Sequence, residues 1–207
     1  MRGPIFKNLV PAQGKPARLY QAVLELMNEG MDISAMKVSD ITRKAGIGKG
    51  TAYEYFKSKE EIIAQAILTN LETFILELDR SMDEVNTFEE KYLAVLGCIE
   101  KNLKDWKSFL PFVRVHQRPC DISHELEKEL FAHIPEEHFL ICLIRKITDF
   151  GKIQGVISKD LPEDAANSAI LAHVMTFVFY LQFPENRRET VGKMKEYSCR
   201  SLLNFLG

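Results

Sequence analysis

Apolar residues recur at spacings of three and four along the whole chain, whereas alternating polar and apolar runs rich in Val, Ile and Thr are missing. This spacing predicts helices and no strands, so we expect an all-α protein. The expected helices span residues 19–27, 38–45, 49–56, 58–80, 87–103, 106–116, 123–133, 136–152, 163–183 and 186–206. The stretch 163–183 is apolar nearly all round, which indicates burial on several sides, including by a partner chain.

Residues with known capping preferences mark the start of two of these helices. Ser58 can cap the long helix that follows it, and Glu60 and Glu61 favour the positive end of that helix's dipole. Thr87 and Glu90 have the spacing of a capping box. We expect the long helix after Ser58 to join the N-terminal part of the chain rigidly to the remainder.

Two short helices near the N-terminus are joined by a tight turn. Residues 38–45 place Val38, Ile41 and Ala45 on one side, Gly46 ends this helix, and the next helix begins shortly afterwards. Two short helices with a Gly-containing turn are typical of a helix-turn-helix, whose second helix enters the major groove of DNA.

The charge of the chain is unevenly distributed. Its 207 residues carry a net charge of −2, but residues 1–60 hold ten Lys or Arg against six Asp or Glu, which is +4, and the remainder is −6. A basic head suggests a polyanionic partner. The hydrophobic share of 46% and charged share of 27% are those of a globular protein, which excludes disordered, collagen-like and disulfide-scaffold classes.

The cysteines and the apolar stretches bear on the cellular compartment. The four cysteines lie far apart without CxxC spacing, as reduced cytosolic thiols do: Cys98, Cys120, Cys142 and Cys199. Residues 1–18 lack the apolar core of a signal peptide, and the longest apolar stretch, 169–181, is shorter than the roughly 20 residues of a membrane span. We therefore expect a soluble, cytoplasmic protein.

The segment VSDITRKAGIGKGTAYEYFKSKEE at 38–61 resembles the DNA-binding segment of TetR-family transcriptional regulators. The matching positions are Ala45-Gly46, Lys49-Gly50-Thr51, Tyr53, Phe56 and Lys59-Glu60. Three features depart from the family pattern. Gly48 replaces the usual hydroxyl cap of the recognition helix, Ala52 replaces a larger hydrophobe, and the loop between the first two helices is about two residues longer.

The resemblance implies two domains. Residues 1–60 would form a three-helix, helix-turn-helix DNA-binding domain in which residues 1–14 are flexible, and residues 61–207 a helical effector-binding and dimerisation domain. The last two helices would pair with their copies as a four-helix interface. The partners implied are an operator in double-stranded DNA, a small-molecule effector and a second copy of the chain.

The matched residues suit contact with DNA. A lysine at the start of the recognition helix can reach a phosphate or a guanine edge, and an adjacent glycine lets the backbone approach the duplex. Hydroxyl groups can bond phosphate, and helix N-termini bind anions. The candidate DNA-binding residues are Lys37, Ser39, Lys49, Gly50, Thr51, Tyr53, Tyr55 and Lys59. A lone basic residue is usually a solvated charge, but the joint pattern favours DNA binding.

Motifs for other chemistry are incomplete. The sequence GIGKGT at 46–51 lacks the spacer and the Lys-Ser/Thr pair of a phosphate loop. His116, Cys120 and His124 are spaced four apart, but Pro119 breaks the helix that would align them on a metal. No HExxH or GxSxG motif is present. We therefore expect no enzyme activity, no metal site and no cofactor.

Aromatic residues are more numerous in the second domain than a narrow helix seam requires. If they converge with nearby polar or soft groups, they would line a mostly apolar cavity, although plain core packing is an equal alternative. The candidate ligand-binding residues are Trp106, Phe109, Phe112, His116, Phe139, Cys142, His173 and Phe177.

The hypothesis from the sequence is a homodimeric repressor that binds a near-palindromic operator and is released by a small, apolar or aromatic effector. Two alternatives stay open. One is a DNA-binding protein of the same fold that a protein partner controls, and the other is a helical ligand-binding or interaction protein without DNA binding. The second alternative predicts no salt-dependent affinity for DNA.

Overall fold

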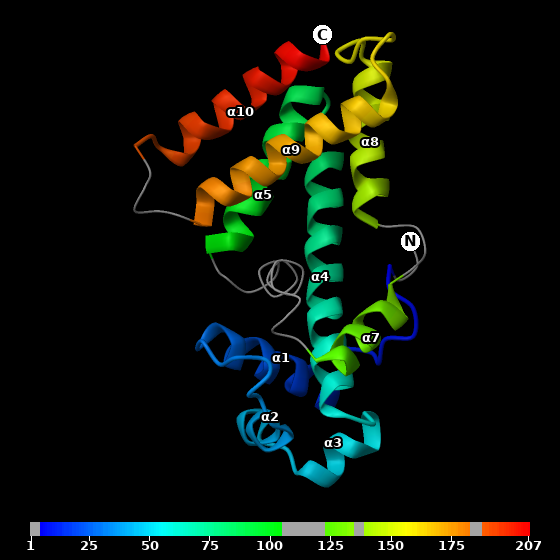
Figure 1. Ribbon diagram of the computed structural model, residues 1–207, viewed down its shortest axis with the longest axis vertical. Helices are drawn as coiled ribbons and strands as arrows, with labels where there is room; N and C mark the ends of the chain where they lie inside the picture. Colours follow the sequence, from blue (N-terminus) through cyan, green and yellow to red (C-terminus); the bar gives the residue numbers. More distant parts are fainter. Residues whose placement is uncertain (1–4, 105–122, 135–138, 183–187) are drawn as a thin grey trace. The chain divides into compact units, whose positions relative to one another are not determined.

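A computed structural model describes residues 5–104, 123–134, 139–182 and 188–207 (Figure 1). All regular secondary structure in these ranges is helical, which confirms the all-α class. The helices are α1 (Gly14–Asn28), α2 (Val38–Ala45), α3 (Lys49–Tyr55), α4 (Lys59–Asp83), α5 (Phe88–Lys104), α7 (His124–His133), α8 (Phe139–Ile153), α9 (Glu163–Gln182) and α10 (Val191–Leu206).

Several helix ends differ from the sequence expectation. Helix α1 begins at Gly14 instead of residue 19. Pro16 is tolerated in its first turn because backbone amides there have no hydrogen-bond acceptor within the helix, so the amide that proline lacks is not needed. Helix α10 begins at Val191 instead of 186 because the Thr190 side chain accepts a hydrogen bond from the Lys193 amide and caps it. The helix expected at 106–116 lies outside the described residues.

The chain forms two compact units that divide within α4. The first consists of Met1–Ile75 and Asp105–Glu136, and the second of Leu76–Lys104 and Glu137–Gly207. The sequence analysis placed the boundary at residue 60, whereas residues 59–75 of α4, and also α7, belong to the first unit. Helix α4 therefore connects the units covalently.

The core of the first unit lies between α1, α2 and α3. Leu19, Val23 and Ile41 are fully buried, and Phe56 is 1% exposed. The rings of Tyr20 and Phe56 lie 5.7 Å apart in a tilted arrangement. Apolar burial at these positions holds the short helices together, because α2 and α3 are too short to be stable alone.

Local hydrogen bonds set the turn and the start of α4. Gly46 adopts a left-handed conformation with φ 62°, which glycine tolerates best, and its amide bonds the Arg43 carbonyl to end α2. The Ser58 hydroxyl accepts from the Glu61 amide at 3.0 Å, as the capping pattern predicted.

The N-terminal segment makes contacts with α4 where it is described. We expected residues 1–14 to be flexible, but Phe6 is 1% exposed, and the amides of Ile5 and Val10 donate to side chains of α4. In the structure, residues 5–10 thus pack against the first unit. A short segment without helical periodicity does not reveal from its sequence that it contacts residues far away in the chain.

The second unit packs α5, α8, α9 and α10 together. Helix α5 begins with the predicted capping box, in which the Glu90 amide donates to Thr87 Oγ1 and the Thr87 amide donates to Glu90 Oε2. Tyr92 is fully buried, and its hydroxyl lies 2.7 Å from Ser198 Oγ on α10. Burial raises the pKa of Tyr92 to about 12, so this hydroxyl stays neutral and ties α5 to α10.

Candidate nucleic-acid interface

Helix α3 has one face in the core and one in solvent. Ala52 is fully buried on α3. Lys49 and Gly50 are exposed, and Tyr53 is 53% exposed. Ala52 anchors α3 in the core, while the lysine, the glycine and the tyrosine are left accessible to solvent. This is the arrangement that a recognition helix needs.

The glycines around the start of α3 are not required by the fold. A Cβ added to Gly48 or Gly50 would meet no atom within 4 Å, and Gly48 has an ordinary φ of −70°. A helical glycine costs about 1 kcal/mol relative to alanine. The internal packing therefore gives no reason for Gly50, whereas close approach of an external backbone does.

Some basic groups of the first unit are already neutralised by acids. Lys44 Nζ lies 2.5 Å from Glu29 Oε1, and Arg43 lies 2.6 Å from Asp40. Within the part of the chain that the structure describes, no ion pair engages Lys37 or Lys49, and both are exposed. The charges of Lys37 and Lys49 are thus more available to a phosphate group than those of Lys44 and Arg43.

The predicted DNA-binding residues lie along α3 and at the starts of α2 and α4 in the first unit. Five of them lie on α3: Lys49, Gly50, Thr51, Tyr53 and Tyr55. Lys37 precedes α2, and Ser39, which is half-buried, lies in its first turn. Lys59 opens α4, where its ammonium lies 3.4 Å from Glu60 Oε1. Thr51 is half-buried and Tyr55 is 41% exposed.

Sequence reasoning missed the role of Arg18. Its guanidinium donates to the Gly46 carbonyl at 3.2 Å, which ties α1 to the turn before α3. A Cβ at Gly46 would come within 2.9 Å of the same guanidinium nitrogen. An exposed arginine in a helix carries no signal for such a contact, because its partner is distant in the sequence.

The candidate ligand-binding residues are only partly described. Trp106, Phe109, Phe112 and His116 lie outside the described residues, as does the side chain of Phe139. Cys142 is exposed, and Phe177 is fully buried. His173 lies with Nδ1 2.8 Å from the Ala169 carbonyl and Nε2 3.2 Å from Ser201 Oγ on α10.

A cavity, the half-buried thiol of Cys98 and the buried thiol of Cys199 lie in the second unit. The cavity, of about 200 Å³, lies between α5 and α10 and is lined by Glu89, Leu93, Glu196, Cys199, Arg200 and Leu203. This volume is below the roughly 300 Å³ of small drug-sized sites. Burial raises the pKa of Cys98 and of Cys199 to about 11, so both thiols are protonated and unreactive at neutral pH.

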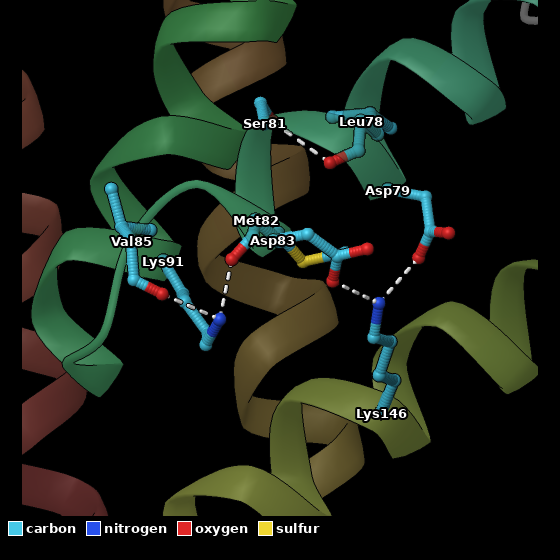
Figure 2. Close-up of polar contacts among 8 residues, drawn as sticks. All are labelled: Leu78, Asp79, Ser81, Met82, Asp83, Val85, Lys91 and Lys146. Carbon is cyan, nitrogen blue, oxygen red and sulfur yellow. Dashed lines mark hydrogen bonds and ion pairs between the residues drawn. The ribbon is translucent and has the colours of Figure 1, made fainter.

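Two lysines hold the C-terminal end of α4 in the second unit (Figure 2). Lys146 of α8 lies 2.6 Å from Asp79 Oδ1 and 2.8 Å from Asp83 Oδ1. Lys91 of α5 donates to the carbonyls of Met82 and Val85, beyond the last helical hydrogen bonds. Two cations at this end also oppose the negative pole of the helix dipole.

Partial burial alone would lower the pKa of Lys146, but hydrogen bonds to Asp79 and Asp83 raise it above its usual value. The ammonium ion is therefore held by both carboxylates. We call Lys146, Asp79 and Asp83 the α4 latch.

Helix α9 keeps a large apolar surface outside the unit's core. Leu171, Met175 and Phe179 are 42%, 38% and 62% exposed, and their spacing of four residues places them in one stripe. Tyr197 and Phe205 of α10 are also exposed. By length and composition α9 is apolar enough to cross a membrane. Only 28% of its most apolar window is buried inside the chain, so most of this apolar surface is left without cover by the same chain.

Comparisons with known proteins all find similarity to bacterial transcriptional regulators. The model for bacterial regulatory proteins of the tetR family matches residues 22–66, which run from α1 into the first turns of α4. The HTH-type transcriptional regulator YvdT of Bacillus subtilis (strain 168) is 27% identical over 187 residues, which cover 89% of this chain and 92% of that protein.

Solved structures show the same fold. The fatty acid degradation regulator FadR from Bacillus halodurans superposes with a TM-score of 0.70 at 20% identity, covering 95% of this chain and 98% of its own. FadR from Bacillus subtilis, in a complex with stearoyl-CoA, has a TM-score of 0.65 at 22% identity over 92% of this chain and 96% of its own. Residues 22–66 thus match the tetR family of bacterial regulatory proteins, and the whole chain is similar to transcriptional regulators and shares the fold of these solved structures.

Proposed function

We propose that the protein is a repressor that binds a near-palindromic operator as a homodimer and releases it when a small effector binds. The exposure of Lys49, Gly50 and Tyr53 on α3, which Ala52 anchors in the core, carries this proposal. Two copies of α3 would enter successive major grooves about 34 Å apart, or a multiple of that distance.

The homodimer is supported by the exposed stripe on α9. A contiguous apolar stripe costs free energy in water, and a second copy of the same stripe would cover it in an isologous contact. Tyr197 and Phe205 of α10 extend the apolar surface in the same unit. The dimer would bring two recognition helices to one operator.

The effector is expected to be apolar. Two fold neighbours are named FadR, and one is bound to stearoyl-CoA. A long-chain acyl-CoA is therefore the first effector to test, with an aromatic acid as the alternative class. A coupling free energy of about 1–3 kcal/mol would give a 5–150-fold loss of operator affinity.

Helix α4 offers the route for this coupling. It is the helix that runs from one unit into the other, so a displacement of its C-terminal end in the second unit would change its direction in the first. The α4 latch resists that displacement. Effector binding would have to break or move the contacts of Lys146.

Selection of random duplex DNA by the purified protein tests the proposal. We expect enrichment of a two-fold-symmetric site whose affinity falls steeply with salt, because lysine–phosphate contacts release counterions. Recovery of a site whose binding no acyl-CoA or aromatic acid weakens would favour control by a protein partner. Weak binding without any motif would contradict DNA recognition by this head.

Replacing Gly50 by Ala should separate stability from DNA binding. We expect a higher thermal midpoint, because alanine favours a helix by about 1 kcal/mol and its Cβ meets no atom of the protein. Operator affinity should fall about tenfold as the methyl group meets the DNA backbone. Gly97→Ala in α5 is the matched control, since its Cβ is also unobstructed, and operator binding should not change. Equal affinity in both variants would contradict close approach at Gly50.

Replacing Lys146 by Met should loosen the α4 latch. Asp79, whose side chain is 14% exposed, would lose its cation, and we expect a loss of about 1–2 kcal/mol in the free energy of unfolding. Calorimetry of full-length protein measures it. Lys193→Met breaks an exposed pair with Glu189 and should cost less than about 0.5 kcal/mol. A second change, Asp79→Asn, should restore part of the loss, and equal losses for the two lysine variants would argue against the latch.

A further inference from the structure

Residues 5–10, which we call the strap, run along α4 in the first unit. The amide of Ile5 donates to Glu72 Oε1 at 2.5 Å, and the amide of Val10 donates to Gln65 Oε1 at 2.8 Å. The Tyr20 hydroxyl of α1 donates to the Val10 carbonyl at 3.0 Å. The strap thus joins α4 and α1 through its own main chain.

The strap also pairs with the end of α7. The Lys7 amide donates to the His133 carbonyl at 3.0 Å, and His133 Nδ1 donates to the Lys7 carbonyl at 2.8 Å. His133 is 9% exposed and Phe6 is 1% exposed, so this pairing is partly shielded from water although Lys7 itself is exposed. Reciprocal bonds in a buried place are stronger than the same bonds in solvent.

Buried polar groups on the helices need the strap as their partner. Gln65 is 1% exposed on α4, and its carbonyl oxygen accepts from the Val10 amide and lies 3.0 Å from the Tyr20 hydroxyl oxygen. Burial also raises the pKa of Tyr20. An unbonded buried amide or hydroxyl costs about 1–3 kcal/mol, so Gln65 and Tyr20 suit the docked strap and not a bare α4.

Helix α7 belongs to the first unit but is separated from the rest of that unit in the sequence. The first unit resumes at Asp105 and ends at Glu136, so α7 lies in an insertion between two stretches of the second unit. Along the chain, α7 is therefore flanked on both sides by stretches of the second unit. The strap connects α7 to the helices that carry the DNA-binding surface.

We infer that the strap is a positioning element that fastens α7 to α4 and α1 and makes operator affinity depend on the position of α7. It does so through Phe6, His133 and the main chain, and it is not a tail that contacts DNA. The dependence of operator affinity rests on the proposed function, whereas the fastening of α7 does not.

Amide hydrogen exchange on the full-length protein tests the fastening. Phe6→Ala removes the buried ring, and Asn8→Val disfavours the left-handed φ of 57° that Asn8 adopts in the strap. Both variants should speed the exchange of residues 5–10 and of α7 at least tenfold. Asn8→Gly tolerates that φ, and Lys7→Ala changes only an exposed side chain, so both controls should exchange as the parent does.

Operator titrations with the same four variants test the dependence. Phe6→Ala and Asn8→Val should weaken binding about tenfold, with the salt slope unchanged, whereas Lys7→Ala and Asn8→Gly should bind normally. A Lys7→Ala variant that binds weakly with a reduced salt slope would make the segment a DNA contact and overturn the inference. Unchanged exchange of α7 in Phe6→Ala and Asn8→Val would overturn it as well, even if the parent protein selects no operator.

Discussion

Replacing Phe179 by Glu should convert the protein to monomers and lower operator affinity by about 100-fold or more. Phe179 is 62% exposed at the end of the α9 stripe, so the change alters a surface and leaves the core of one chain intact. In a symmetric dimer the variant would bury two carboxylates without cations, which costs several kcal/mol. A monomer then contacts one half-site only, and specific binding exceeds non-specific binding by about 10³-fold or more.

Sedimentation at several concentrations measures the oligomeric state, and titration of the selected operator measures the affinity. Ile153→Glu is the matched control because Ile153 is 83% exposed at the end of α8, away from the stripe. It should remain dimeric and bind DNA normally. Leu171→Glu, in the same stripe as Phe179, should reproduce the monomer. A dimer that persists in both stripe variants would contradict the proposed interface.

Local patterns in the sequence were sufficient to predict the helix-turn-helix. Helix α2 has the predicted bounds Val38–Ala45, and α3 begins at Lys49 as predicted. These elements depend on neighbours in the sequence, such as the left-handed Gly46 and the cap from Ser58, which short motifs record well. The outward position of Lys49 and Tyr53 follows from the same helical spacing.

Contacts between distant residues were not predictable in the same way. The strap pairs Lys7 with His133, residues that stand 126 apart in the chain, and its main-chain hydrogen bonds leave no mark in residue type. Gln65 offered the one indication, because an amide on an apolar helix face requires a buried partner. The α4 latch is similar, since Lys146 and Asp79 are ordinary surface residue types until the fold brings them together.

The division of the chain shows the same limit. A long helical stripe predicted α4, but apolar spacing does not reveal which half of such a helix packs with which unit. The structure divides the chain after Ile75, in the middle of α4, instead of at residue 60. Side-chain partners that lie elsewhere in the sequence decide that division.

Replacing Lys49 by Ala should weaken operator binding about 30-fold or more and reduce its dependence on salt. Lys49 is exposed at the first position of α3, and none of the ion pairs among the described residues engages it. A lysine contact with a guanine edge or phosphate is worth about 1–3 kcal/mol, and a dimer loses two of them. The slope of log affinity against log salt should fall by about 2 if both ammonium groups contact phosphate.

Lys101→Ala is the matched control, because it removes the same charge from an exposed position on α5 in the second unit. It separates a specific contact from a change in net charge, which acts weakly at physiological salt. Tyr53→Ala should weaken binding in the same direction as Lys49→Ala but with little change in salt slope, since its hydroxyl carries no charge. If Lys49→Ala and Lys101→Ala bound the operator equally well, α3 would not be the recognition helix, and the DNA contacts would have to be sought at the starts of α2 and α4.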